Sequence, residues 1–380
     1  MILPLIHKLI LERSLSVDIE AGITLKIKDD AFRPGTVRVH LPAPINASWL
    51  KEGQLLDSDP MFRMASVEDY PQRSVYFNER LTENTQFSVK YAFASTHKYV
   101  KPDLALIDST EQKGFSEEEI KRFSSSHHCG CESYTALPAD AVSILDVIED
   151  RGIKFEPEYK SFIEKISQSD LKQQKNGTMA YSIYRFITEQ FNKLGRNDHN
   201  IAFVSMCRRC GIPARWQGGW ATSGIVCPDS DTNIQYAATN HDWAMVHLLP
   251  YGWIYVDCKF GAESYDLKLT CPCSCTDTDL KSTISNQKST TSEQITSSEG
   301  ISLQEYFFGN IDPCMVPTAS APKADLYPAK DYERADKTFN VYGEVELVPD
   351  KLGSEGHFEG YGLKSDEFTS EVYIKNFIAS

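Results

Sequence analysis

The sequence predicts an α+β fold in which a small β-sandwich precedes a helical part packed on an antiparallel sheet. Three observations lead to this prediction. Apolar and polar residues alternate through much of residues 20–95, apolar residues take helical spacing between 115 and 210, and strand-like runs return after residue 218. A period of two is typical of half-buried strands and a period near 3.6 of helices. Strands and helices in separate blocks favour the α+β class.

The first block contains three alternating runs, at residues 23–27, 37–41 and 87–93. Each run has one apolar face, and Pro and Gly residues lie between the runs, as in short antiparallel strands joined by turns. We therefore expect an N-terminal β-sandwich-like domain over residues 1–105.

The second block should form the helices and strands of a core domain, residues 115–270. Ser116 and Glu119 have capping-box spacing before a short helix, and another short helix is expected at 139–149. Longer helices are predicted from the apolar stripe between 180 and 191 and from residues 200–210. Strands are expected at residues 218–222, 242–249 and 253–257.

The last part of the chain is expected to divide into two segments. Residues 271–300 are rich in Ser and Thr and have few apolar anchors, which predicts an insertion. Residues 301–380 contain the strand-like run at 343–348 and end in an acidic, glycine-rich stretch. We expect them to form a C-terminal extension that completes the core and ends in an acidic tail.

The composition indicates a globular protein and argues against two classes of partner. A hydrophobic fraction of 41% with 11% aromatic residues is enough to form a core, and 380 residues suit two or three domains. The net charge of -14 argues against a nucleic acid or an anionic membrane surface as partner, because both are bound chiefly by clustered Lys and Arg.

The N-terminal residues and the cysteines give information on the cellular compartment of the protein. The apolar start reaches a charge at Lys8 and has neither a basic region nor a small-residue cleavage site, so we expect a cytoplasmic protein. The ten cysteines leave disulfides open if the compartment is oxidising. No cofactor is expected.

His241 and Asp257 are the strongest candidates for site chemistry. His241 begins one predicted strand and Asp257 ends the next, with a turn near residues 250–252. The reversal returns both side chains to one edge of the sheet, although a bulge or an offset register is needed for contact. A carboxylate beside one imidazole nitrogen leaves the other nitrogen available for proton transfer. Trp243 should lie on the same face and shield the pair.

Residues 195–261 resemble the core of the transglutaminase-like superfamily, which has a papain-like fold. The matching stretches are GIPARWQGGW, HDW and PYGWIYVD, in that order. The resemblance implies a cysteine nucleophile at the start of a central helix, followed by His and Asp on adjacent strands. It also implies an amidase, peptidase or acyl transferase activity. The family's spacing places the nucleophile at Arg196 or, with one residue of slack, at Asn197.

Neither Arg196 nor Asn197 offers the nucleophilic lone pair of a thiolate. The resulting hypothesis is a non-catalytic relative that keeps the pocket to bind a peptide, an amide-bearing partner or another protein segment. The alternative hypothesis is an active enzyme that uses a relocated cysteine. A structural protein with a vestigial pocket is a third possibility. Trp243, Trp220 and Gln217 are expected to line the pocket, and Trp220 is also expected, with Trp216 and Trp253, to contribute to the core.

The cysteines near the predicted site have several interpretations. Cys207 and Cys210 share a helical stripe with Phe203, which favours packing, while a CxxC redox or metal half-site and a relocated nucleophile remain alternatives. Cys258 alternates to the other face from Asp257 and should be a small buried residue. Arg215 is expected to be a buried charge that ties helix to sheet, with a substrate contact as the alternative.

Two metal-binding alternatives also remain open. Cys129 and Cys131 lie beside His127 and His128, and a CPCSC run covers residues 271–275, so these loops could bind a thiophilic metal. They lack the paired CxxC spacing of a structural zinc site, so no metal site is predicted. His199 facing His241 across the pocket would be another metal pair, without a carboxylate spacing to support it.

Overall fold

The computed structural model describes the chain in segments. These are residues 3–45, 47, 49–65, 73–83, 86–110, 176–190, 199–210, 212–223, 235–265, 268–269, 301–320, 326, 342–349, 361–364 and 366–378. The short helix predicted at the Ser116–Glu119 capping box, the helix predicted at 139–149 and the insertion at 271–300 lie outside these residues, as do Arg196 and Asn197.

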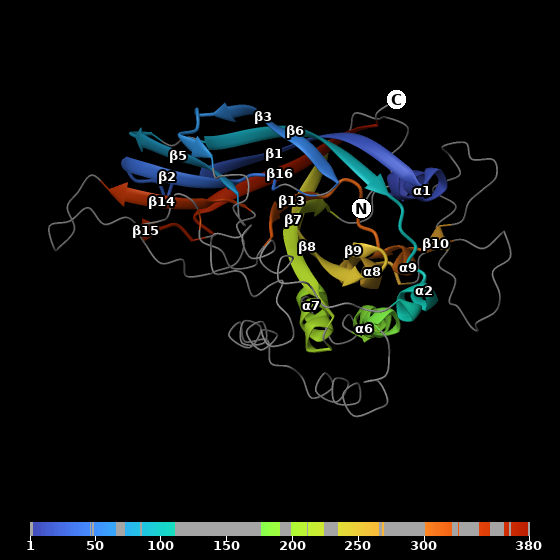
Figure 1. Ribbon diagram of the computed structural model, residues 1–380. Coiled ribbons are helices and arrows are strands. Elements are labelled where there is room, and N and C mark those ends of the chain that lie inside the picture. The colour runs from blue at the N-terminus through green and yellow to red at the C-terminus, as the bar shows by residue number, and fades with distance from the viewer. Residues whose placement is uncertain are drawn as a thin grey trace.

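Two large antiparallel sheets, a two-stranded sheet of β10 and β11, and a helical layer make up the described part of the chain (Figure 1). The larger sheet has nine strands in the order β12-β9-β8-β16-β1-β6-β3, with β7 pairing with β8 and β13 with β7. The smaller sheet has five strands in the order β15-β14-β2-β5-β4. These arrangements confirm the α+β class.

The strands are β1 (Ser14–Ile27), β2 (Gly35–Pro42), β3 (Leu50–Asp59), β4 (Met64–Ala65), β5 (Ser74–Leu81), β6 (Gln86–Lys98), β7 (Ala214–Thr222), β8 (Gln235–Leu248), β9 (Gly252–Val256), β10 (Lys268–Leu269), β11 (Ile301–Ser302), β12 (Phe308–Gly309), β13 (Val316–Ala319), β14 (Glu344–Pro349), β15 (Tyr361–Gly362) and β16 (Phe368–Ile378). The helices are α1 (Leu3–Glu12), α2 (Leu104–Ser109), α6 (Asn176–Gln190), α7 (His199–Arg209), α8 (Cys258–Glu263) and α9 (Leu303–Tyr306).

The alternating runs of the first hundred residues form β1, β2 and β6, as predicted, and their apolar side chains are buried. Strand β2 lies in the smaller sheet, whereas β1 and β6 belong to the larger one. Strand β16 pairs with β1 on one side and with β8 on the other, so the larger sheet continues into the central region. The difference arises because alternation predicts a strand and its buried face but leaves the partner strand open.

The C-terminal strands divide between the two regions. Strands β12 and β13 pair with β9 and β7 of the central region. The run predicted at 343–348 is β14, which pairs with β2, while β16 pairs with β1. Residues after 340 thus complete the sheets of the first hundred residues, and the sequence prediction had assigned them to the core extension.

Helices α6 and α7 lie on the side of the central strands that faces away from the N-terminal strands (Figure 1). The predicted stripe of α6 is buried, including Ile183 and Tyr184. Asp108 of α2 fixes the start of α6 by accepting hydrogen bonds from the backbone N–H groups of Gly177 (2.9 Å) and Thr178 (3.2 Å). No helix among the described residues is both long and apolar enough to cross a membrane.

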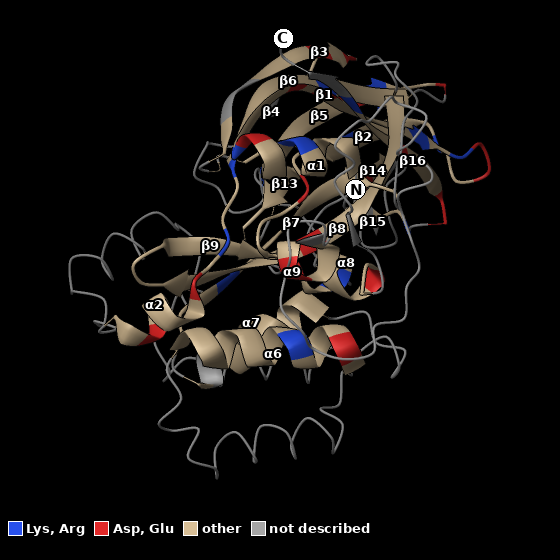
Figure 2. Cartoon of the chain, turned by 90° about the vertical axis from the view of Figure 1, so that its right-hand side faces the viewer, with Lys and Arg blue, Asp and Glu red and all other residues tan. Residues whose placement is uncertain are grey.

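Charged residues of both signs are interspersed over the described elements (Figure 2). On α6, Arg185 and Glu189 form an ion pair one helical turn apart. Ile183 and Ile187 of the same helix are completely buried. Helix α6 therefore presents a charged outer face and an apolar inner face, as expected for a surface helix packed on a sheet.

Candidate functional site

His241 and Asp257 meet at the end of the central strands. Nε2 of His241 lies 2.6 Å from Oδ2 of Asp257, and the residues are 3% and 0% exposed. Strands β8 and β9 pair Ala244 with Val256 in an unbroken register, so Asp257 falls opposite Trp243 and diagonally across from His241. The offset register brings the two residues to diagonal positions, without a bulge between these two strands.

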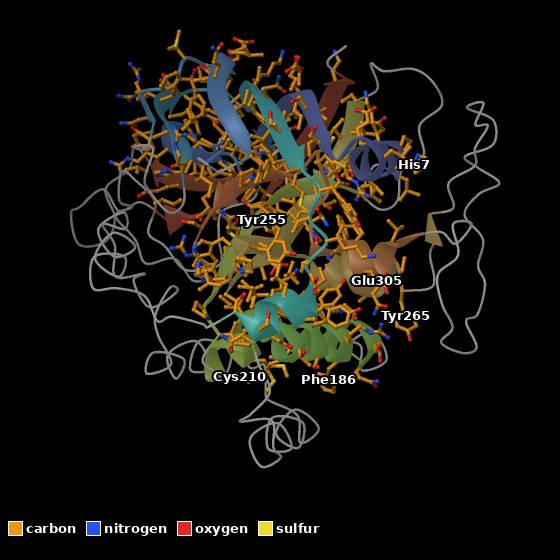
Figure 3. The ribbon with its side chains drawn as sticks, turned by 45° about the vertical axis from the view of Figure 1, so that its right-hand side comes forward. His7, Phe186, Cys210, Tyr255, Tyr265 and Glu305 are labelled. Atoms are coloured by element: carbon orange, nitrogen blue, oxygen red, sulfur yellow. The ribbon has the colours of Figure 1, made fainter. Side chains whose placement is uncertain are left out.

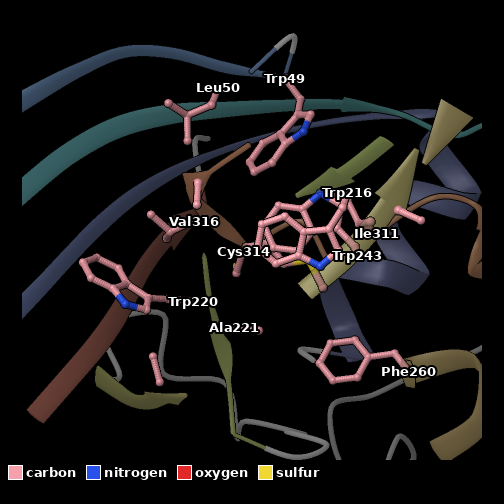
Figure 4. Packing of buried hydrophobic residues seen from close by; sticks show 14 of the residues in the cluster. Trp49, Leu50, Trp216, Trp220, Ala221, Trp243, Phe260, Ile311, Cys314 and Val316 are labelled. Carbon is pink, nitrogen blue, oxygen red and sulfur yellow. The ribbon is translucent and has the colours of Figure 1, made fainter. Parts of the chain in front are cut away.

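Two aromatic rings enclose the imidazole. The Phe260 ring stacks on His241 with centroids 4.0 Å apart and an interplanar angle of 24°. Trp243 lies at 6.5 Å with the same angle. Both aromatic residues belong to the buried core, as Figure 4 shows. The imidazole is thereby held in one plane while water is excluded from its faces.

Asp257 serves two purposes with its two carboxylate oxygens. Oδ2 contacts His241, and Oδ1 accepts a hydrogen bond of 2.9 Å from the backbone N–H of Phe260, which makes Asp257 the N-cap of α8. An N-cap carboxylate satisfies a helix N–H group that has no partner within the helix. The same residue therefore places Phe260 over the imidazole and orients the imidazole itself.

The contact with Asp257 assigns the chemistry of the two imidazole nitrogens. A carboxylate accepts a hydrogen bond, so Nε2 of His241 carries the proton and Nδ1 is the acceptor in the neutral ring. Among the described residues, Nδ1 of His241 makes no hydrogen bond. Nδ1 is thus the nitrogen that can accept a hydrogen bond or a proton from a bound molecule.

Gln217 and Trp243 share the face of the sheet that carries His241. They are paired directly across β7 and β8, and Nε1 of Trp243 donates a 2.9 Å hydrogen bond to Oε1 of Gln217. Trp220 pairs with Asn240 instead, which places its side chain on the opposite face, where it is completely buried. Figure 4 shows Trp220 apart from Trp243 and Phe260. The structure therefore groups Gln217 and Trp243 with the pair and separates Trp220 from it.

Asp242 and Asn200 also belong to this region, and neither was among the site residues predicted from the sequence. Asp242 is half-buried and accepts a 2.8 Å hydrogen bond from Nε1 of Trp216. Burial raises the pKa of Asp242, an effect that Asp257 reinforces and that His241 and hydrogen bonds from Trp216 and Asn200 oppose. The available signals were the place of Asp242 inside HDW and that of Asn200 in the first turn of a predicted helix, where Asn side chains commonly bond backbone groups.

The described cysteines do not reach the imidazole. Cys207 of α7 is completely buried, as predicted for a packing residue, and Figure 3 shows Cys210 on the side of the helical layer away from the N-terminal strands. Cys258 is completely buried, and burial followed by the nearby Asp257 raises the pKa of its thiol well above the usual value. None of the sulfur atoms in the described ranges forms a hydrogen bond with His241.

Arg215 interacts within the sheet. Its guanidinium stacks on the ring of Trp253 at 4.4 Å, and burial lowers its pKa to about 10. Arg215 is on β7 and Trp253 on β9, so this contact spans β8. Arg215 was expected to be a buried charge that ties helix to sheet; it is half-buried, and its contact with Trp253 joins two strands.

The metal-binding alternatives gain no support in the described residues. These residues contain no group of three His, Cys, Asp or Glu side chains that could hold a metal ion. His199 is buried at the start of α7. Cys129, Cys131 and the two neighbouring histidines lie outside the described residues, as does the CPCSC run.

Comparison with protein families gives one match. Residues 162–258 match the family described as the transglutaminase-like superfamily. The matched region includes α6, α7 and the strands that carry His241 and Asp257. Neither the curated proteins nor the solved structures yielded a match. Residues 162–258 are therefore a transglutaminase-like region of the chain.

Proposed function

We propose that the transglutaminase-like domain is a non-catalytic binding domain that recognises a peptide or protein segment through its amide groups. The observation that carries the proposal is the combination of an ordered His241–Asp257 pair with Arg196 and Asn197 at the expected nucleophile position. A guanidinium or a carboxamide cannot attack a carbonyl carbon as a thiolate does.

The described cysteines support the same conclusion. A relocated nucleophile needs a thiolate, and thiolates form where positive charge or a helix N-terminus lowers the pKa. Cys258 has the opposite environment, because burial and neighbouring Asp257 both raise the pKa of its thiol. Cys207 is completely buried near the end of α7, far from the helix N-terminus.

The polar atoms on the His241 face suit an amide. Nδ1 of His241 is an acceptor, and the amide nitrogen of Gln217 makes no hydrogen bond to a described residue. Trp243 fixes Gln217 by donating to its oxygen, so the Gln217 nitrogen is the end left for a ligand. An amide group of a ligand offers a donor for the imidazole and an acceptor for Gln217.

Binding to a peptide array tests the proposal. We expect the wild-type chain to bind a subset of glutamine- and asparagine-containing peptides, and His241→Phe to weaken the best of them about tenfold, because one buried hydrogen bond is lost. Isothermal titration calorimetry with the selected peptide measures the change.

His247→Phe is the matched control, since His247 lies on the same strand and makes an edge-to-face contact with Trp253, with ring centroids 5.3 Å apart. It should bind as the wild type does. Conversion of the peptide to a new product would contradict the non-catalytic role. Equal affinity in the wild type and His241→Phe, with only the stability changed, would instead indicate a vestigial pocket.

A further inference from the structure

Asn200 connects the backbone beside His241 to the backbone beside Asp257. Its Nδ2 donates a 2.7 Å hydrogen bond to the carbonyl oxygen of Asp242. Its Oδ1 accepts a 2.8 Å hydrogen bond from the N–H of Cys258. Asp242 and Cys258 each follow one member of the pair in the sequence, and Asn200 is completely buried. One side chain therefore spans the two segments that carry the pair.

The ladder between β8 and β9 ends before it reaches the pair. The last paired residues of β8 and β9 on this side are Ala244 and Val256. His241 and Asp257 both lie beyond this last pair, where His241 still pairs with Gly219 of β7 and the N–H of Asp257 donates to the carbonyl oxygen of Phe307. Between the two segments themselves, hydrogen bonds from a side chain can replace the missing ladder bonds. Asn200 supplies such bonds to both segments at once.

We infer that Asn200 is a positioning residue that couples the start of helix α7 to the geometry of the His241–Asp257 pair. Asn200 is the second residue of α7, so any displacement of this helix start changes the spacing of the segments it joins. The Nε2–Oδ2 contact is short, and a small separation of the segments would lengthen it. The inference rests on the proposed function only in treating the pair as the binding site.

The imidazole proton of His241 reports this coupling directly. A proton shared between Nε2 and a buried carboxylate over a short distance gives a strongly downfield proton resonance and exchanges slowly with water. In Asn200→Leu, which removes both hydrogen bonds and keeps the branched shape of the side chain, we expect the resonance to move upfield or to be lost to exchange. Nuclear magnetic resonance of the full chain with 15N-labelled histidine measures both effects without any ligand.

Asn310 offers a matched control. Its side chain is also buried and joins backbone groups, accepting from the N–H of Val100 at 2.8 Å and donating to the carbonyl oxygens of Val100 (2.7 Å) and Tyr306 (2.9 Å). Asn310→Leu should lower thermal stability as Asn200→Leu does and leave the His241 resonance in place. The comparison separates positioning from a general loss of stability.

Two results would overturn the inference. The first is an unchanged His241 resonance in a folded Asn200→Leu chain, and the second is an equal change in Asn310→Leu. If Asn200→Leu does not fold, Asn200→Ser serves instead, because its smaller side chain adds no bulk and its hydroxyl falls short of both backbone groups, so an upfield shift is again expected. Since this readout needs no peptide, a failed binding experiment and a failed positioning experiment remain distinguishable.

Discussion

Replacing Asp257 with alanine is expected to lower the free energy of unfolding by about 3 to 5 kcal/mol. The substitution removes the acceptor for the buried Nε2–H of His241 and leaves that donor without a partner. It also removes the N-cap of α8, where Oδ1 accepts from the N–H of Phe260. Both effects act on groups that are completely or almost completely buried. Equilibrium unfolding in urea measures the loss.

Asp103→Ala is the control that separates the cap from the pair. Asp103 caps α2, a helix of the same length as α8, and accepts a 3.1 Å hydrogen bond from the N–H of Leu106. Asp103 is exposed and has no imidazole beside it, so its loss should cost about 1 kcal/mol. If Asp257→Ala lowered the free energy of unfolding no more than Asp103→Ala does, the His241–Asp257 contact would add no stability beyond helix capping.

Gly219→Ala is expected to lower the free energy of unfolding by about 3 kcal/mol or more, or to prevent folding. A Cβ atom at Gly219 would lie 1.9 Å from the carbonyl oxygen of Val316 and 2.9 Å from Cα of Pro317. These are backbone atoms of β13, which pairs with β7, so the strand itself must move. Gly219 pairs with His241, and the displacement would reach the site. Thermal unfolding followed by circular dichroism gives the change.

Gly252→Ala provides the comparison for this prediction. Gly252 has a φ of +76°, and an added Cβ atom would meet no atom within 4 Å. Gly252→Ala should therefore lower the free energy of unfolding through backbone strain alone, by about 1 kcal/mol. If the Gly219→Ala and Gly252→Ala chains had the same free energy of unfolding, β13 would be able to shift without loss of stability. The expected effect of its close packing on β7 would then be contradicted.

The pairing of His241 with Asp257 was predictable because the two residues flank a turn and alternate onto one face. The place of Trp220 was not predictable in the same way. Trp220 lies on the strand predicted at 218–222 and Gln217 directly before it, and only the register between β7 and β8 shows that Gln217 shares the face of His241. That register depends on packing across the sheet rather than on the strand's own pattern.

Asn200 and the C-terminal strands escaped prediction for a related reason. The role of Asn200 depends on two backbone groups that lie far from it in sequence, at Asp242 and Cys258. The run that forms β14 was predicted as a strand, and its partner β2 lies about three hundred residues earlier. Local patterns specify an element and its buried face, while partners across the chain are chosen by the whole core.

Alkylation of the native chain tests most directly whether the domain lacks an activated thiol. The wild type and His241→Phe are treated briefly with iodoacetamide at neutral pH, and mass spectrometry follows each of the ten cysteines. We predict that every cysteine reacts at the same rate in both chains, because no thiol is activated by the imidazole. Rapid modification of one cysteine in the wild type, slowed in His241→Phe, would contradict the non-catalytic account and identify the nucleophile of a working enzyme.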